Sequence, residues 1–315
     1  MAVATNNYPD ITAFGDYIDA QTRLLPELPE VEVLTPRIIR VMGCNPGRMQ
    51  LQGTNTYLLG TGPEKILIDT GAGDRRWAEL VSSLVNDWGI LIRHVLLTHW
   101  HGDHTGGVPD MVRLYPNLKD DIFKCDPAHG QQAIVEEQVF TVPGVTVRAI
   151  HTKGHTADHM CFLMDEERAL FTGDTLLGNG ANTAVENMSE YMTSLRKIQE
   201  RDCHIAYPGH GDKIPDLTKK LKQEVDRCLQ RESRVLMTLR KIQKSNAAAG
   251  DRGKGGATTT ELVNEMFGSL SASVRESAIQ PAVKEMLMKL AAEKKVGFEL
   301  KAGQKRWFAK SQVVA

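Results

Sequence analysis

The sequence lacks several features that mark large classes of protein. None of its apolar runs approaches the roughly 18 to 20 residues that a membrane-spanning helix needs. The N-terminus has no apolar signal core, and Asp10 and Asp16 with no arginine before Arg23 are unlike a mitochondrial transit segment. The five cysteines are scattered and form no CxxC pair, which argues against a disulfide framework. We therefore expect a protein of a reducing compartment, by default the cytoplasm, without membrane contact.

Two further absences bear on chemistry and on partners. The chain has no GxSxG nucleophile elbow, so the sequence does not predict a serine hydrolase of that type. Aromatic residues make up only 6% of the chain, and no run of about five like charges occurs. Few aromatic rings to stack on bases and no dense basic run both weigh against a nucleic-acid-binding protein.

Charge is present in both signs but is unevenly distributed. From Leu217 to the C-terminus the chain holds 20 Lys and Arg against 10 Asp and Glu, a net charge of +10. The first 216 residues carry a net charge of −11. This asymmetry indicates an acidic partner for the C-terminal part. Lysine-rich helix faces in contact with solvent account for it equally well.

The pattern of apolar residues over the first two thirds predicts alternating strands and helices. Helices are expected at 75–88 and 189–201, where apolar residues recur at helical spacing. Strands are expected at 37–43, 55–60, 65–70, 92–98, 145–151, 159–164, 168–172 and 203–207. We predict an α+β fold with two sheets sandwiched between helices, an αββα sandwich, over residues 1–216.

Residues 217–315 have a different texture and are expected to form a separate module. Asp216 is a plausible N-cap for a long helix, and the small, glycine-rich residues 244–256 suggest a flexible connection. Helices are expected after Thr258 and near 273–293, followed by two short strands around 301–305. Helix, helix and hairpin resemble a winged-helix module, which can bind nucleic acid or serve for packing or dimerisation.

The stretch LLTHWHGDHTGG at 96–107 carries the chemistry. Three histidines and an aspartate fall within six positions directly after an apolar strand. His99 and His101 are two residues apart, so at a strand end their side chains point the same way. Asp103 and His104 follow a turn and face a second position. Four donors in so short a segment cannot all reach one ion, which favours two metal ions.

Three later donors occur in a repeated setting. His155, Asp174 and His210 each follow an apolar strand and lie beside a glycine. Each can therefore reach a site at the ends of neighbouring strands. Imidazole and carboxylate suit zinc, although such a site also accepts manganese or iron. We expect two divalent ions, with Zn²⁺ favoured over Mn²⁺ or Fe²⁺.

The motifs THWHGDH, GHT, TGDT and PGHG, in that order, resemble the metallo-β-lactamase superfamily across residues 37–216. The resemblance implies that His99, His101 and His155 hold one metal, that Asp103, His104 and His210 hold the other, and that Asp174 bridges both. The C-terminal module resembles the lactamase-B-like hydrolases that end in a winged-helix-like segment. Within that subgroup, residues 25–62 look like the fungal thioesterases of this superfamily. Those enzymes release aromatic polyketides from the acyl carrier protein of non-reducing polyketide synthases. Lys153 departs from the relatives, which usually have proline there.

The expected reaction follows from two metals that share a water and lower its pKa towards about 7. Asp103 would orient the attacking oxygen and accept or shuttle its proton. A thiol has a pKa of about 8.5, so a thiolate leaves more easily than an amide nitrogen, which favours a thioester substrate. The carrier protein would dock on basic residues of the C-terminal part: Lys219, Lys220, Lys222, Arg227 and Arg231. Lys153 and Trp100 are further candidates for substrate contact, although Trp100 fits the core equally well.

Other histidines and the cysteines have simpler interpretations. His94 and His204 fit packing or surface positions, and His129 and His151 have no partner motif. His159, four residues after His155, is a candidate hydrogen-bond partner behind the metal ligands. The cysteines fit small buried apolar positions.

Three alternatives stay open. The same two-metal site beside a basic winged-helix-like module could cut RNA or DNA. A small-molecule thioesterase of the glyoxalase II type shares the motif but differs in its C-terminal region. A binding module with a vestigial site is disfavoured because all seven ligand positions are filled. The C-terminal module is also a candidate homodimer surface.

Overall fold

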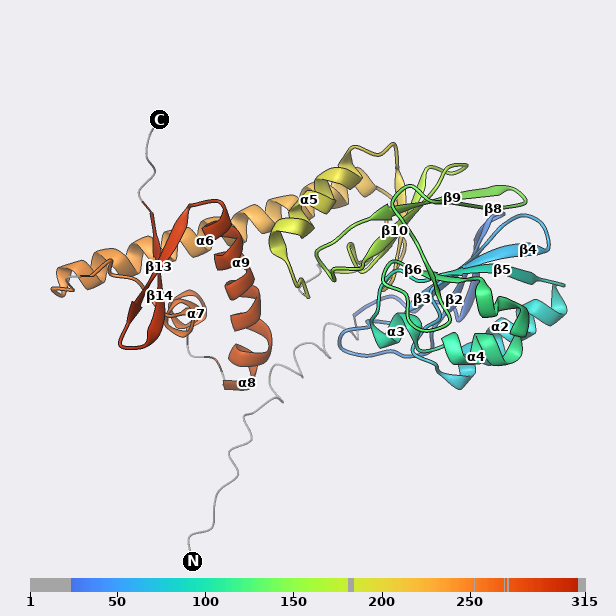
Figure 1. Cartoon of the computed structure of the whole chain (residues 1–315), viewed down its shortest axis with the longest axis horizontal. Coiled ribbons are helices and arrows are strands. Elements are labelled where there is room, and N and C mark those ends of the chain that lie inside the picture. The colour runs from blue at the N-terminus through green and yellow to red at the C-terminus, as the bar shows by residue number, and fades with distance from the viewer. Residues whose placement is uncertain (1–23, 181–183, 252, 269, 271, 311–315) are drawn as a thin grey trace, which may run out of the picture. The chain divides into compact units, whose positions relative to one another are not determined.

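The computed structural model describes residues 24–180, 184–251, 253–268, 270 and 272–310 (Figure 1). The expectations for Asp10, Asp16 and Arg23 fall outside these residues. The described chain divides into two compact units, residues 24–223 and 224–310. In the described part of the chain, no helix combines the length and the apolar character needed to cross a membrane.

The first unit contains a seven-stranded sheet with the strands in chain order. Strands β1 to β4 pair antiparallel, whereas β4 to β7 run parallel. The strands are β1 (Val31–Thr35), β2 (Ile38–Met42), β3 (Asn55–Leu59), β4 (Glu64–Ile68), β5 (Leu91–Leu96), β6 (Ile122–Lys124) and β7 (Gln132–Ala133).

A five-stranded sheet packs against the first. Its order is β12-β11-β10-β9-β8, and only β11 and β12 are parallel. The strands are β8 (Val139–Val142), β9 (Val145–His151), β10 (Met160–Met164), β11 (Ala169–Gly173) and β12 (Ile205–Pro208). Apolar side chains from the facing sides of both sheets form one core between them. In that core Phe171 meets the ring of Tyr57 edge-on at 5.0 Å between centroids and stacks on Tyr207 at 5.3 Å.

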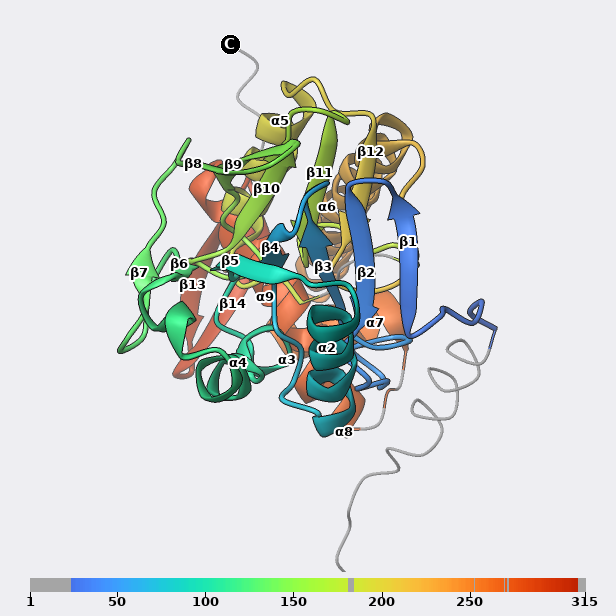
Figure 2. The same ribbon diagram turned by 90° about the vertical axis from the view of Figure 1, so that its right-hand side faces the viewer.

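Helices cover the outer faces of both sheets (Figures 1 and 2). Helix α2 (Arg75–Asp87) and helix α4 (Val108–Leu114) lie on the first sheet, where Trp77, Val81 and Leu84 join the apolar side chains of its outer face. These residues recur every three or four positions, as the helical period requires. Helix α5 (Met188–Gln199) lies on the second sheet. The expected α+β fold with helix, sheet, sheet and helix layers is confirmed.

The second unit has the expected order of elements. Helix α6 (Leu217–Ala248) begins in the first unit, and the Asp216 carboxylate accepts from Lys219 N at its start, at 2.8 Å. Helix α7 (Thr259–Phe267) opens with a capping box between Thr258 and Glu261. The remaining elements are α8 (Ala272–Val274), the π-helical turn η2 (Arg275–Ile279), α9 (Gln280–Ala292), β13 (Val296–Lys301) and β14 (Gln304–Ala309).

The structure corrects the sequence prediction at the glycine-rich connection, which was expected at 244–256. Helix α6 continues to Ala248, because alanine is the strongest helix former and glycine enters only at 250. The residues after the helix are tied back to it, since Asn246 Nδ2 donates to Gly255 O at 3.0 Å. The connection is therefore shorter and more anchored than its composition suggested.

Candidate metal centre

Four segments of the first unit bring the candidate ligands together at the ends of neighbouring strands. Residues 99–104 follow β5 and run into the short helix α3 (Gly102–Thr105). His155 lies in the loop between β9 and β10, Asp174 follows β11 directly, and His210 follows β12. The seven predicted ligand residues therefore meet at one edge of the sandwich, as the repeated pattern of strand, glycine and donor suggested.

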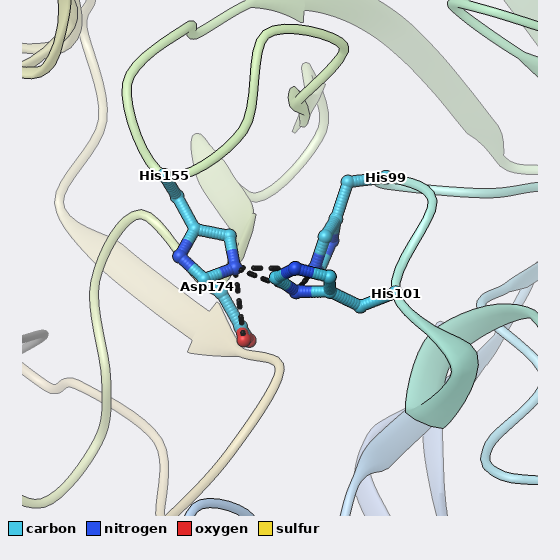
Figure 3. Close-up of side chains that lie close together, drawn as sticks. All are labelled: His99, His101, His155 and Asp174. Carbon is cyan, nitrogen blue, oxygen red and sulfur yellow. Dashed lines mark hydrogen bonds and ion pairs between the residues drawn. The ribbon is translucent and has the colours of Figure 1, made fainter. Parts of the chain in front are cut away.

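The first donor group consists of His99, His101, His155 and Asp174, whose donor atoms lie within 4.8 Å of one another (Figure 3). His101 Nδ1 is 2.9 Å from His99 Nε2 and 3.1 Å from His155 Nε2. Asp174 Oδ2 is 3.5 Å from His155 Nε2. Two nitrogens bound to one tetrahedral zinc ion stand about 3.3 Å apart, so this spacing suits a shared divalent ion.

The second donor group consists of Asp103, His104 and His210. His210 Nε2 is 3.3 Å from Asp103 Oδ2. The other oxygen of Asp174, Oδ1, lies 3.4 Å from His104 Nε2 and 3.5 Å from His210 Nε2. Asp174 thus faces both groups with different oxygens, the arrangement that a shared ligand of two ions requires.

One buried atom of the second group fits a metal ligand. His104 is completely buried, and its Nε2 makes no hydrogen bond within the described part of the chain. An unpaired buried polar atom is costly in a native structure and calls for a partner. A divalent cation between His104, Asp103 and His210 would supply that partner, so the residues present fit a metal.

Hydrogen bonds on the far side of three imidazoles orient them. His104 Nδ1 is 2.7 Å from Asp69 Oδ2, His210 Nδ1 is 3.2 Å from Gly53 O, and His155 Nδ1 is 2.6 Å from Ala184 O. With these acceptors the Nδ1 atoms carry protons, and each Nε2 is the ring nitrogen that faces the centre. Metal-binding histidines in proteins are held in this way.

Asp69 contacts the candidate centre from behind, a contact that the sequence analysis did not predict. Its carboxylate also accepts from Thr98 N at 2.8 Å and from Thr98 Oγ1 at 2.9 Å, so it joins the ends of β4 and β5. Its φ of +58° is the left-handed conformation, which aspartate and asparagine tolerate better than most residues. The signal was present: Asp69 follows an apolar strand and precedes Gly71, much as the other donors do.

His159 lies behind the centre. Its Nε2 accepts from Asp174 N at 3.0 Å, and its Nδ1 is 2.9 Å from Thr152 Oγ1. It therefore contacts the backbone of Asp174, consistent with the expectation of a hydrogen-bond partner behind the ligands.

Two glycines allow the close approach of these loops. A Cβ at Gly209 would stand 2.5 Å from Asp174 Oδ1 and 2.8 Å from His104 Cε1. Gly154 has φ of +135°, and a Cβ there would meet the backbone of Tyr191 at 2.4 Å. A side chain at Gly209 would therefore collide with two donor residues, and one at Gly154 would force the loop that carries His155 away from Tyr191.

Burial and charge act differently on the two donor groups. Burial, reinforced by the neighbouring His104, lowers the pKa of His99 well below its ordinary value. Burial also lowers the pKa of His155. At His210 burial acts in the same direction, but the carboxylates of Asp174 and Asp103 outweigh it and raise the pKa to about 9. His99 and His155 thus offer neutral imidazoles, while the carboxylates of the second group attract positive charge, whether protons or a cation.

The pKa of the Asp103 carboxylate shifts in the opposite direction to that of His210. Burial alone would raise the pKa of Asp103, but the hydrogen bond from His210 and the charge of His104 lower it far below its ordinary value. Asp103 is therefore a carboxylate at neutral pH, able to hold a cation.

The predicted substrate and partner residues fall in different places. Trp100 is 55% exposed, with its ring 4.4 Å from that of His101, so it lies on the surface beside the first donor group and not in the core. Lys153 is exposed, and its carbonyl accepts from Ser194 Oγ. Lys219 and Lys222 are exposed on α6.

The structure corrects the prediction for Lys220. Its side chain is buried, and Nζ donates to Gly180 O at 2.7 Å, which anchors α6 to the loop after Asp174. A buried lysine bound to a carbonyl cannot contribute to a docking face.

The remaining histidines and cysteines largely follow the simpler interpretations. His94 packs edge-on against Phe123 and Phe140, and His204 and His129 are exposed. His151 Nε2 lies 3.0 Å from Ala157 O, a local contact with the backbone. Cys161, Cys203 and Cys228 are buried as expected, whereas Cys44 and Cys125 are only partly buried.

Comparison with known proteins agrees with this geometry. The profile of the metallo-beta-lactamase superfamily matches residues 50–210. The chain is 53% identical over 306 residues to a protein of Aspergillus fumigatus named atrochrysone carboxyl ACP thioesterase, covering 96% of each chain. A protein of the same name from Aspergillus terreus is 49% identical over 98% of this chain and 97% of the other. A crystal structure of a beta-lactamase domain protein from Burkholderia ambifaria shares the fold, with a TM-score of 0.70 at 14% identity over 90% of this chain and 95% of that chain. The chain therefore belongs to the metallo-β-lactamase superfamily.

Proposed function

We propose that this protein is a metal-dependent thioesterase that releases an aromatic polyketide from the acyl carrier protein of a non-reducing polyketide synthase. The observation that carries the proposal is the pairing of two donor groups through Asp174 in a chain about half identical, over nearly its full length, to proteins named atrochrysone carboxyl ACP thioesterase. The name of these relatives indicates the carrier protein and the acyl group, and the two donor groups indicate metal-dependent hydrolysis.

Residues 1–216 carry catalysis in this proposal, and residues 217–315 form the module that receives the carrier protein. Two divalent ions bound by the donor groups, Zn²⁺ in preference to Mn²⁺ or Fe²⁺, would polarise the thioester carbonyl and make a water acidic enough to attack at neutral pH. The chain's own residues then position that water and move its proton.

Asp103 is the residue best placed to handle the proton. Its side chain is 19% exposed, whereas the imidazoles of His104 and His210 are almost fully buried, so it is the member of its group that a water can reach. Held as a carboxylate, it can accept a hydrogen bond from the attacking water and take up its proton. The thiol leaving group has a pKa of about 8.5 and departs as thiolate without a separate acid.

Substrate contacts belong to the surface beside the first donor group. Trp100 offers an exposed indole next to His101, a suitable wall for a flat aromatic acyl chain. Lys153 is an exposed cation on the loop that carries His155. It could contact phenolic or carboxylate oxygens of the substrate. The C-terminal module is also a candidate homodimer surface, which sedimentation velocity tests.

The decisive experiment offers the protein two substrates. A carrier protein loaded with an aromatic polyketide acyl group and a single-stranded RNA are incubated separately with the protein, before and after chelation. We expect release of the free acid from the carrier protein, its loss on chelation and its return with Zn²⁺. RNA cleavage without thioester turnover would favour the nuclease alternative. Thioester cleavage that survives chelation would contradict the metal chemistry.

A further inference from the structure

Residues 43–54, the loop that joins β2 to β3, are closed on themselves beside the second donor group. Gly43 N donates to Thr54 O at 2.6 Å, and Thr54 N donates to Asn45 Oδ1 at 2.9 Å. Asn45 Nδ2 returns a hydrogen bond to Thr54 Oγ1 at 3.0 Å. Because both ends are fixed, the loop holds its inner residues in defined positions.

Two residues of this loop contact the second donor group. Gln50 Nε2 donates to Asp103 Oδ2 at 3.1 Å. The carbonyl of Gly53 accepts from His210 Nδ1 at 3.2 Å. With Asp69 behind His104, each donor of the second group has a hydrogen-bond partner outside the group, and this loop supplies two of these three partners.

We propose that Gln50 is a positioning residue that fixes the Asp103 carboxylate for the second metal position. Asp103 has the most exposed side chain of its group, so it has the most freedom to rotate. The oxygen that Gln50 holds, Oδ2, is also the one that faces His210. A carboxylate oxygen has two lone pairs, so a hydrogen bond from Gln50 leaves one for a cation. The inference rests on the proposed two-metal centre and not on the identity of the substrate.

A substitution at Gly47 can also disturb the contact between Gln50 and Asp103. A Cβ at this position would stand 2.7 Å from Gln50 Oε1. The backbone of Gly47 is not in the left-handed region, so an alanine there would displace the Gln50 amide without straining its own backbone. Gly47→Ala is therefore a second way to disturb the contact while Gln50 itself is kept.

The test measures metal binding and not only activity. Protein stripped of metal is titrated with Zn²⁺ by calorimetry for the wild type, Gln50→Met and Gly47→Ala. Gln52→Met is the matched control, because Gln52 lies in the same loop but donates away from the centre, to Pro26 O at 3.0 Å. Thermal unfolding of the metal-free proteins checks that each variant is folded.

We expect Gln50→Met to weaken one of two Zn²⁺ binding steps by about 10- to 100-fold, the usual effect of removing a hydrogen-bond partner of a metal ligand. Gly47→Ala should weaken the same step to a smaller extent, and Gln52→Met should leave both steps unchanged. Unchanged titrations for Gln50→Met, or equal weakening of both steps, would overturn the proposal. A raised KM with unchanged metal binding would make Gln50 a substrate contact instead. Since Zn²⁺ binding is measured without substrate, failure here is distinguishable from failure of the thioesterase proposal.

Discussion

Asp69 Oδ2 lies 2.7 Å from His104 Nδ1, and both side chains are buried. Asp69 sits at the end of β4 and His104 in α3, so the contact fixes the imidazole from behind while Nε2 faces Asp174. The same carboxylate accepts two hydrogen bonds from Thr98. Asp69 therefore orients His104 of the second donor group and also holds Thr98, the residue directly before His99 of the first donor group.

The first prediction concerns this carboxylate. Asp69→Asn keeps the left-handed backbone but offers one acceptor oxygen in place of two, so the hold on His104 weakens. We expect Zn²⁺ affinity or turnover to fall by about 10- to 100-fold. Asp69→Ala leaves buried donors of Thr98 and His104 unpaired and should also cost about 1–3 kcal/mol in the free energy of unfolding. Zinc content after dialysis and urea unfolding measure the two effects; wild-type zinc content in Asp69→Asn would contradict this role.

A second prediction concerns the shared carboxylate. Asp174→Asn retains the shape of the side chain but not the charge that faces both donor groups. Both metal positions should then weaken together, beyond the ~100-fold typical for partners behind the ligands. Metal analysis after gel filtration provides the measurement. If the variant kept two ions and full thioester turnover, Asp174 would not be a shared ligand.

A third prediction concerns docking of the carrier protein. Lys219 and Lys222 are exposed on α6, whereas Lys220 is buried and is left intact. Lys219→Glu with Lys222→Glu should lower kcat/KM for an acidic carrier protein about tenfold at low salt, because charge complementarity mainly governs the association rate. Turnover of a small thioester should not change.

The matched control for docking reverses two exposed cations that do not belong to α6, Arg93 in β5 and Lys119. It changes net charge by the same amount. Equal loss in both variants, or equal loss on both substrates, would contradict a docking face on α6.

A fourth prediction concerns the ion pair of Lys124 and Asp158, whose side chains are each 7% exposed and 2.8 Å apart. Thr156 Oγ1 also donates to Asp158, so the pair anchors the loop that carries His155 to β6. Lys124→Met would leave a buried carboxylate without its counter-ion and should cost about 3–5 kcal/mol. The double variant with Asp158→Asn should recover part of this loss in urea unfolding. A cost below about 1 kcal/mol would mean that the pair does not hold the loop.

A fifth prediction concerns pH and the second unit. Burial acts to raise the pKa of Glu232, but hydrogen bonds from Lys289 and Lys295 outweigh it and lower the pKa below its ordinary value. A depressed carboxylate pKa stabilises the fold above the unfolded pKa, and this stability is lost as pH falls through the folded pKa.

Unfolding of the second unit should therefore become easier between about pH 5 and pH 3. Glu232→Gln should lower the free energy of unfolding at pH 7 by about 1.5–3 kcal/mol, as expected for hydrogen bonds between charged groups, and should flatten the acid dependence. Hydrogen exchange of α9 amides at several pH values measures how the stability of the second unit depends on pH. A variant with the wild-type acid profile would exclude Glu232 as the titrating group.

The sequence was most informative where donors follow apolar strands. Residues such as His155 and His210 could be placed because a strand end with a glycine puts a donor at a sheet edge. Asp69 has the same setting but no histidine nearby to draw attention to it. Gln50 could not be found, because its role depends on how residues 43–54 fold over Asp103, which no local pattern encodes. Lys220 was misplaced since charge in a sequence does not reveal which side of a helix is buried.

The seven donors come from four segments spread between His99 and His210, and only the finished sandwich brings them together. A nascent chain offers a passing cation no more than the hexapeptide at 99–104, so tight capture must come after folding. Ions that bind the native state alone also shift the folding equilibrium towards it, by an amount that grows with their free concentration. The supply of the divalent metal that the site binds would then govern how long this protein survives proteolysis as well as how fast it works.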